Sequence, residues 1–501
     1  MRTLALTFFL LWQLACAAGP MTIELSAPTY AGQVVRLYRY DDLYTLRTVR
    51  LTEALITSHG TAHLEADVNG TAKLQLRIGN TSGDLYARPG ITLHISFPPP
   101  PTGTARSLGT TTRVALEFTE LDPLDINALT TDLNERVDAF IAEDLATDEA
   151  AGMQALAVRR TNDQAPDTSA PQRPATLFVT PMLSTARVDT FEHKLRRFYA
   201  EVKDPWFAHY LDNSMAGLRQ GTRTSERETH ERWIKGRALH YDDPEQVRFL
   251  RSFYADLLPA FVHRYNDEAL QRALQARSAD SLTAVFARHD FLKDDDRLCE
   301  LVAMDQVYQH YHAKYLDRQA VQTILGQWAS SSRYTEHRTI AANMLWDRTA
   351  MQPGSTLPPM LLEDERGQRV ELDSLLSGPV CLVITASWCT YCELEMAGLE
   401  QLQATYKDQI AIIAISLDSS LADLRAYRKA HPAQDFRWLH ALADQQLRED
   451  LRLRSLPAFY LLNNGVLARS PAPMPSTGLG ALFHLVKVQA EQDGRIKVWD
   501  D

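Results

Sequence analysis

The sequence predicts a multidomain protein with three structurally different parts: a β-rich N-terminal part, a central all-α region and a C-terminal α/β domain. Three observations indicate this division. Short alternating apolar runs separated by turn residues fill residues 19–120. Apolar residues then recur with helical spacing over 121–350. In 351–501, buried strand patterns alternate with helical ones, which is typical of parallel strands joined by crossover helices.

Residues 1–18 are expected to be a secretory signal peptide. Arg2 precedes an apolar core from Leu4 to Leu14, and small residues follow around Cys16. This core is too short to span a membrane. The alternative is a lipoprotein anchored through Cys16, although Gln13 stands where a lipobox usually has an aliphatic residue. We therefore expect export across the inner membrane to the periplasm or cell envelope. No other stretch is apolar for long enough to span a bilayer, so we expect no transmembrane segment in the mature chain.

Residues 19–120 contain six short runs with the pattern of strands that bury one face. Turn residues separate the runs, as at Asn69-Gly70 and Asn80-Thr81-Ser82-Gly83. The prolines from Pro98 to Pro101 predict a stiff exposed loop. The expected strands are Met21–Leu25, Val34–Tyr40, Thr61–Val68, Ala72–Ile78, Ile91–Phe97 and Arg113–Phe118.

The region 121–350 is expected to be helical. Asp125–Leu145 has the pattern of one amphipathic helix, and the polar, proline-rich residues from about 161 to 174 indicate a linker. Aspartate-proline pairs begin at Asp204 and Asp243 and mark element boundaries. The run Asp294-Asp295-Asp296 is typical of a helix N-cap. We expect this region to hold no catalytic group and to supply partner surface or spacing.

The last part is organised around Cys389 and Cys392. The apolar run Val380–Ile384 predicts a buried strand, Trp388 follows it, and helical spacing begins at the cysteines. The two thiols therefore lie in the first turn of a helix, where unpaired N–H groups carry partial positive charge. This field stabilises a thiolate at Cys389 and makes it the attacking group. Cys392, one turn in and on the inward face, is the expected resolving thiol.

Glu395 lies three residues after Cys392, on the same helix face as Leu399 and Leu402. A carboxylate on an apolar face loses its hydration, and it is placed to exchange a proton with the neighbouring thiol. The alternative is a glutamate that reaches past the apolar face to solvent. We expect Glu395 to be catalytic.

The remaining elements of the C-terminal part alternate between strand and helix. The expected strands are Val380–Thr385, Ile410–Leu417, Ala458–Leu462 and a return near Val466–Arg469. The expected helices are Cys392–Tyr406, Leu421–His431, Ala443–Leu451 and Gly478–Gln489.

Four separate segments between Pro353 and about Gln489 form one pattern: Pro353-Gly354-Ser355-Thr356-Leu357-Pro358, Trp388-Cys389-x-x-Cys392 with Glu395, Ser416-Leu417-Asp418, and Leu456-Pro457. Together these segments resemble the TlpA/ResA-type thiol–disulfide oxidoreductases. The chain departs from that family at Ala397, where proline is frequent, and at Ile384-Thr385, where the family often has Phe-Trp.

The resemblance implies a thioredoxin-like fold for 351–501, preceded by a β-sandwich in 19–120 and a helical region in 121–350. It implies a redox-active disulfide between Cys389 and Cys392, and substrate binding by Trp388, Leu456 and Pro457, with a cis Leu456–Pro457 bond. Protein thiols or disulfides would be the substrates, and a membrane electron donor would supply electrons. Relatives with glutamate at this place mostly reduce, so we expect a disulfide reductase.

Composition excludes several other classes. The net charge of −11 over 501 residues is mild, and no basic stripe indicates nucleic acid. Five cysteines are too few to make so long a chain a disulfide-stabilised scaffold, so Cys299 and Cys381 are expected to be buried free thiols. His310 and His312 fall on different helix faces, and we expect no metal or cofactor. A non-catalytic scaffold protein of the cell envelope that keeps the thioredoxin fold for binding remains the alternative function.

Overall fold

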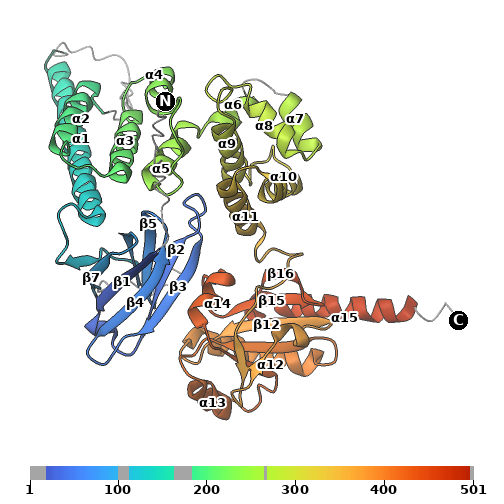
Figure 1. The fold of residues 1–501 in the computed structure, drawn as a ribbon. Coiled ribbons are helices and arrows are strands. Elements are labelled where there is room, and N and C mark those ends of the chain that lie inside the picture. Colours follow the sequence, from blue (N-terminus) through green and yellow to red (C-terminus); the bar gives the residue numbers. More distant parts are fainter. Residues whose placement is uncertain (1–18, 80, 100–111, 163–182, 264–267, 497–501) are drawn as a thin grey trace, which may run out of the picture. The chain divides into compact units, whose positions relative to one another are not determined.

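The structure is a computed structural model that describes residues 19–79, 81–99, 112–162, 183–263 and 268–496 (Figure 1). The expected signal peptide with Cys16, most of the expected linker, and the end of the proline run lie outside the described residues. The described chain divides into two compact units. Of the described residues, the first unit contains 19–78, 82–99 and 114–345, and the second contains those from Trp346 onward together with Gly79, Thr81, Thr112 and Arg113.

Two sheets with one shared core open the first unit. Their strand orders are β4-β1-β7-β9 and β3-β2-β5-β6-β8. Ile23, Leu64 and Leu93 from the first sheet and Leu37 and Leu74 from the second belong to one buried apolar cluster. The bounds are β1 Gly19–Ser26, β2 Val34–Tyr40, β3 Thr48–Leu55, β4 Thr61–Val68, β5 Ala72–Ile78, β6 Thr81–Ala87, β7 Thr92–Ser96, β8 Thr112–Arg113 and β9 Glu117–Thr119.

Two sequence-based expectations for this part were wrong in detail. The segment Thr81-Ser82-Gly83 was expected to be a turn, but it begins β6. Gly83 is required there because a Cβ would lie 2.4 Å from the side chain of Leu116. The run Arg113–Phe118 was expected to be one strand, but it is split between β8 and β9, which pair in different sheets.

Helices α1 to α10 and most of α11 lie in the first unit. Both expected aspartate-proline boundaries are helix starts: Asp204 accepts from the Phe207 N–H at 2.9 Å, and Asp243 caps α5 in the same way. Asp295 caps α9, which confirms the expected N-cap. The bounds are α1 Ile126–Asn162, α2 Thr185–Phe198, α3 Pro205–Gln220, α4 Glu226–Trp233, α5 Pro244–Phe253, α6 Leu257–His263, α7 Glu268–Gln275, α8 Ala279–Phe286, α9 Asp296–Gln309, α10 Arg318–Ser331 and α11 Thr335–Thr349.

Direct hydrogen bonds join the sheets of the first unit to its helices. The side-chain amide of Asn127, in α1, donates to the carbonyl of Tyr86 at 2.8 Å and accepts from its N–H at 2.7 Å. Arg88, after β6, forms a two-pronged ion pair with the N-cap carboxylate Asp204. The β segment and the helical segment therefore belong to one compact unit.

The second unit is built on one seven-stranded sheet with the order β11-β10-β14-β13-β12-β15-β16. Strands β12, β13 and β14 are parallel, and β15 and β16 continue the sheet antiparallel. The bounds are β10 Leu362–Asp364, β11 Arg369–Val370, β12 Pro379–Thr385, α12 Thr390–Tyr406, β13 Ala411–Ser416, α13 Leu421–Ala430, β14 Arg437–Ala441, α14 Asp444–Asp450, β15 Ala458–Asn463, β16 Val466–Ala472 and α15 Leu479–Ile496.

The register of the parallel strands brings three chain segments to one edge of this sheet. Thr385 at the end of β12 pairs with Ser416 in β13, and Ser416 pairs with His440 in β14. The residues after these strands therefore meet at the carboxyl edge, where open α/β sheets carry their sites. The unit has apolar clusters on both faces of the sheet, with Ile384 in one and Val383 in the other.

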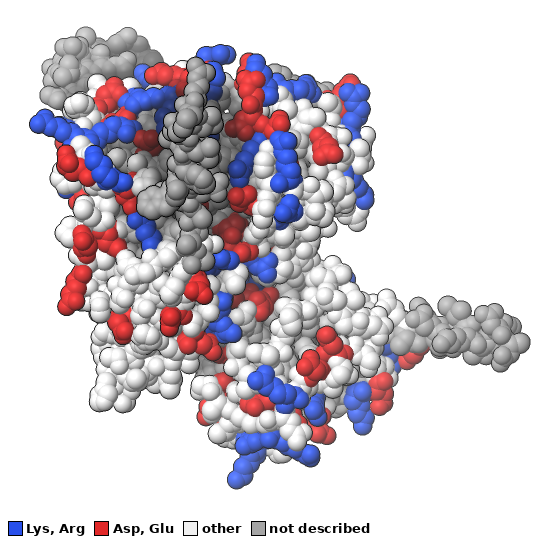
Figure 2. All heavy atoms as spheres, in the orientation of Figure 1, with Lys and Arg blue, Asp and Glu red and all other residues white. Residues whose placement is uncertain are grey.

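On the visible face of the described residues, neither charge sign is concentrated in one place. Figure 2 shows basic and acidic side chains mixed over the visible face of each unit. Among the described residues, no helix combines the length and apolar character that crossing a membrane requires.

Candidate active site

Cys389 and Cys392 are joined by a disulfide at the start of α12, with their Cα atoms 5.2 Å apart. Cys389 is the N-cap residue of the helix, and its sulfur accepts from the Cys392 N–H at 3.2 Å. This sulfur thus takes the place that a serine or aspartate oxygen has in an ordinary N-cap. Negative charge on it would be favoured by the same N–H and by the partial positive charge of the helix end.

The two sulfur-bearing residues differ in accessibility. Cys389 is 9% exposed and Cys392 is 2% exposed. Apolar side chains beside them are far more open, since Trp388, Tyr391 and Leu394 are each at least half exposed. The guanidinium of Arg448 lies 5.8 Å from the ring centre of Trp388. A partner that reaches Cys389 would therefore meet an apolar rim first.

Glu395 points inward, as expected, and is only 1% exposed. Its carboxylate accepts two hydrogen bonds from Ser476, one from the N–H at 3.1 Å and one from the hydroxyl at 2.5 Å. The close approach of the two segments depends on Gly398, because a Cβ there would lie 2.8 Å from the Cβ of Pro475. The sequence alone did not indicate Ser476, which lies 81 residues after Glu395.

The expected cis bond between Leu456 and Pro457 is present. Both residues are buried, and Leu456 belongs to the same apolar cluster as Cys389 and Cys392. The expected substrate-binding residues thus differ in exposure, with Trp388 open and Leu456 and Pro457 covered. Their contact with substrate stays a prediction.

Asp418 forms hydrogen bonds with Ser387, in the segment that precedes the two cysteines. Its carboxylate accepts from the Ser387 N–H at 2.9 Å, the Ser387 hydroxyl at 2.8 Å and the Ser416 hydroxyl at 2.6 Å. The group is 2% exposed, so these three donors replace its lost hydration. Ser387 lies two residues before Cys389, and Asp418 therefore fixes the backbone on which the disulfide stands.

A buried histidine supports Asp418 from the neighbouring strand. The Nε2 atom of His440 lies 3.0 Å from the Asp418 carbonyl oxygen, and its Nδ1 atom lies 2.8 Å from a carboxylate oxygen of Glu363. Both ring nitrogens face acceptors, so the imidazole is held at both ends. Sequence reasoning did not single out His440 or Glu363, because their strands were not expected.

The other two described cysteines take no part in this site. Cys299 and Cys381 are buried and free, as the sequence predicted. Burial raises the pKa of each thiol to about 12, so neither forms a thiolate readily near neutral pH.

The C-terminal unit also resembles known proteins in sequence. Residues 353–469 match the AhpC/TSA family. This match covers the cysteines, Glu395, Asp418 and Pro457, and ends before Ser476. The chain is 26% identical to the thioredoxin-like protein YneN of Bacillus subtilis over 113 residues, which are 23% of this chain and 66% of that protein. It is 34% identical to the thiol-disulfide oxidoreductase ResA of Geobacillus kaustophilus over 80 residues, which are 16% of this chain and 46% of that protein.

A further ResA, from Bacillus subtilis, is 25% identical over 131 residues, which are 26% of this chain and 70% of that protein. The chain thus spans less than half of the Geobacillus relative and about two thirds of the Bacillus proteins. Two solved structures are also similar. A thiol:disulfide interchange protein from Bacteroides sp. is 17% identical, with a TM-score of 0.25, and the match covers 28% of this chain and 90% of that one. A thiol-disulfide oxidoreductase from Bacteroides fragilis is 20% identical, with a TM-score of 0.22, and the match covers 24% of this chain and 91% of that one.

Proposed function

We propose that the C-terminal unit is a thiol–disulfide oxidoreductase that acts through Cys389 and Cys392. The observation that carries the proposal is the disulfide at the start of α12, with the Cys389 sulfur in the N-cap position. The sequence similarity to ResA over the same unit supports it.

The reaction moves two electrons and two protons. In the reduced enzyme, the Cys389 thiolate attacks one sulfur of a substrate disulfide, and the other substrate sulfur leaves as a thiolate that takes a proton. Cys392 then loses its proton and attacks the Cys389 sulfur, which releases the second substrate thiol and forms the intramolecular disulfide. Glu395 lies one helical turn from Cys392 and would accept the Cys392 proton in this second step.

The apolar rim and the buried proline have separate roles in this scheme. Trp388, Tyr391 and Leu394 offer apolar contact to the chain that carries the substrate disulfide. Leu456 and Pro457 supply main-chain contact to the same partner. A donor dithiol, which we place on a membrane electron carrier, reduces the Cys389–Cys392 disulfide after each cycle.

We further propose that the protein works outside the cytoplasm as a reductase. Disulfides persist in such compartments unless reducing power is delivered, so a dedicated reductase has a substrate there. The residues between the cysteines, Thr390 and Tyr391, include no cation that would favour a strongly acidic thiolate. Strong oxidants depend on such stabilisation of their reduced form.

Trapping tests the activity directly. With Cys392→Ala, the first step can occur but resolution cannot, so Cys389 should retain substrate as mixed disulfides that dithiothreitol releases. The double variant Cys389→Ala, Cys392→Ala is the matched control. Two results together would favour the non-catalytic scaffold function. Cys392→Ala would carry no adduct, and alkylation of the wild-type chain would find Cys389 and Cys392 as thiols that never oxidise.

Equilibration in a glutathione buffer tests the direction. A reductase should have a reduction potential near that of thioredoxin, roughly −270 mV. A potential near that of DsbA, roughly −120 mV, would show an oxidant. The mass change on alkylation of the two thiols reports the reduced fraction at each ratio of glutathione to its disulfide.

A further inference from the structure

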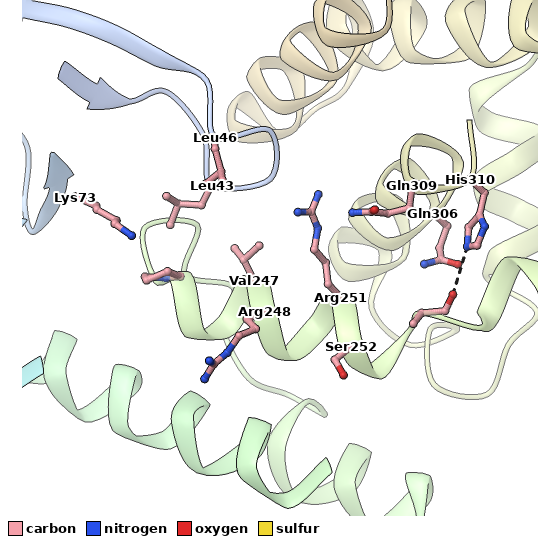
Figure 3. A pocket seen from close by; sticks show the side chains of 12 residues that line it. Leu43, Leu46, Lys73, Val247, Arg248, Arg251, Ser252, Gln306, Gln309 and His310 are labelled. Carbon is pink, nitrogen blue, oxygen red and sulfur yellow. Dashed lines mark hydrogen bonds between the residues drawn. The ribbon is translucent and has the colours of Figure 1, made fainter. Parts of the chain in front are cut away.

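A groove of about 660 Å³ runs along α5 in the first unit (Figure 3). Its other walls are the loop after β2, which contains Leu43 and Leu46, and the end of α9 at Gln306 and Gln309. This volume is within the range of about 300 to 1,000 Å³ that holds small-molecule ligands. None of the residues that line the groove takes part in the proposed redox chemistry.

The loop wall of the groove is held in one conformation by buried hydrogen bonds. The carboxylate of Asp42 accepts from the backbone N–H of Tyr44 at 2.8 Å and of Thr45 at 2.6 Å. Asn343 in α11 donates to Asp42 at 2.8 Å and accepts from Arg47 at 2.8 Å. The loop is thus tied at both ends to a helix, and its shape does not have to be created by a ligand.

The same loop places an apolar side chain at the rim in a strained conformation. Leu46 has a φ of 58°, in the left-handed region, which is energetically unfavourable for a leucine because of its Cβ. Its side chain is nevertheless 49% exposed, so burial does not compensate for this cost. Together with Leu43 and Val247 it forms an apolar wall. Retained strain of this kind is found where a side chain is positioned for binding.

The Lys and Arg side chains that line the groove supply N–H donors. Arg251 bonds to Asp305 through Nε and Nη2, at 2.7 to 3.2 Å, and its Nη1 has no hydrogen-bond partner among the described residues. The Nζ atom of Lys73 lies 3.3 Å from a carboxylate oxygen of Asp84. An ammonium group has three N–H donors, so this one contact leaves others for a ligand. The side-chain oxygen of Gln306 accepts from the Leu258 N–H, which leaves the NH₂ group of this amide as a further donor. No carboxylate is among the lining residues.

We propose that this groove binds an organic anion with an apolar body. Its carboxylate or phosphate oxygens accept from Lys73 and Arg251, and its carbon chain lies against Val247, Leu43 and Leu46. Figure 3 shows Val247 between Lys73 and Arg251. The neighbouring carboxylates already offset much of the positive charge, so the anion is held by hydrogen-bond donors together with apolar contact.

Three probes with one common carbon chain test this proposal on the full chain: hexanoate, hexyl phosphate and 1-hexanol. Calorimetric titration should show one saturable site for at least one of the anions, and 1-hexanol should bind at least about tenfold more weakly. Either ranking of the anions supports the proposal and identifies the preferred headgroup. Binding of the alcohol as tightly as both anions, or no saturable binding of any probe, would overturn it.

Variants locate the site. Lys73→Met keeps an unbranched apolar stem but removes the ammonium, and it should weaken anion binding by about tenfold with little effect on 1-hexanol. Lys235→Met is the matched control, because Lys235 is exposed and paired with Glu231 on α4, away from the groove. Arg251→Met, at the other cation of the proposed site, replaces Lys73→Met if circular dichroism shows that the latter does not fold. Equal weakening by the control, or no weakening by the lining variants, contradicts the assignment.

Discussion

Replacing Glu395 by glutamine separates the charge of this side chain from its structural role. The carboxylate accepts from the N–H and the hydroxyl of Ser476. In Glu395→Gln, the amide oxygen can still accept from the fixed N–H, and the amide nitrogen can donate to the hydroxyl oxygen, which is both donor and acceptor. Both hydrogen bonds therefore survive in neutral form, and the expected loss of stability is only about 1 kcal/mol.

The rate should respond much more strongly than the stability. General acid–base catalysis contributes about 10²- to 10⁴-fold, so we expect Glu395→Gln to slow resolution by about a hundredfold near neutral pH and to change its pH profile. The matched variant Ser476→Ala keeps the charge but loses the 2.5 Å hydrogen bond. It should cost about 1.5 to 3 kcal/mol of stability and slow the reaction less than about tenfold.

Stopped-flow fluorescence of Trp388, which adjoins Cys389 in the sequence, can follow reduction of the disulfide by dithiothreitol in both variants. In that reaction Cys392 leaves the disulfide, which is the reverse of the resolution step and passes through the same proton transfer. Thermal unfolding gives the stabilities. The reasoning is refuted if Glu395→Gln has the wild-type rate from about pH 6 to 8. It is also refuted if Ser476→Ala is as slow as Glu395→Gln, because then the hydrogen bond and not the charge would determine the rate.

Three further changes have distinct expected outcomes. Gly398→Ala places a Cβ 2.8 Å from the Cβ of Pro475. Although alanine favours helices, this contact should destabilise the second unit by about 1 to 2 kcal/mol in thermal unfolding. An unchanged melting temperature would show that the contact relaxes freely. Asp418→Ala leaves the Ser387 N–H without its acceptor and should lower the stability by about 3 kcal/mol. Asp418→Asn keeps one acceptor oxygen and should lower it less. Equal losses of stability in the two variants would argue against these hydrogen bonds. Burial raises the pKa of Asp243 from 3.8 to about 7, so the folded state keeps a proton that the unfolded state loses between these values, and stability falls as pH rises through this window. Asp243→Asn removes that fall, and its stability relative to wild type should grow by on the order of 3 kcal/mol between about pH 4 and 7 in urea unfolding; a difference that does not depend on pH contradicts the assigned cause.

Features encoded by neighbouring residues could be predicted from the sequence. The aspartate N-caps at Asp204 and Asp243 need only the two or three N–H groups that follow them. The buried strand before Cys389 and the inward face that carries Glu395 follow from local periodicity alone. The free state of Cys299 and Cys381 followed from burial and from the small number of cysteines.

Features that depend on pairing with distant residues could not be predicted. Strand β14 has the sequence Arg-Trp-Leu-His-Ala, which has no clear alternation, and it is a strand because β13 and β10 pair with it on both sides. His440 acquires its partners only through that pairing. Ser476 was missed for the same reason, since nothing in its own neighbourhood refers to a carboxylate 81 residues earlier.

The hydrogen bonds between Ser476 and Glu395 have a consequence for the order of events during synthesis. A chain that emerges from its N-terminus exposes both cysteines and Glu395 long before the segment with Ser476 has been made. Until that segment docks beside Gly398, the carboxylate lacks both of its donors, so packing α12 against the sheet at this point would bury it without hydrogen bonds, which is unfavourable. The thiols are therefore chemically present well before their environment is complete, and any oxidation in that interval takes place in a site without its finished proton acceptor.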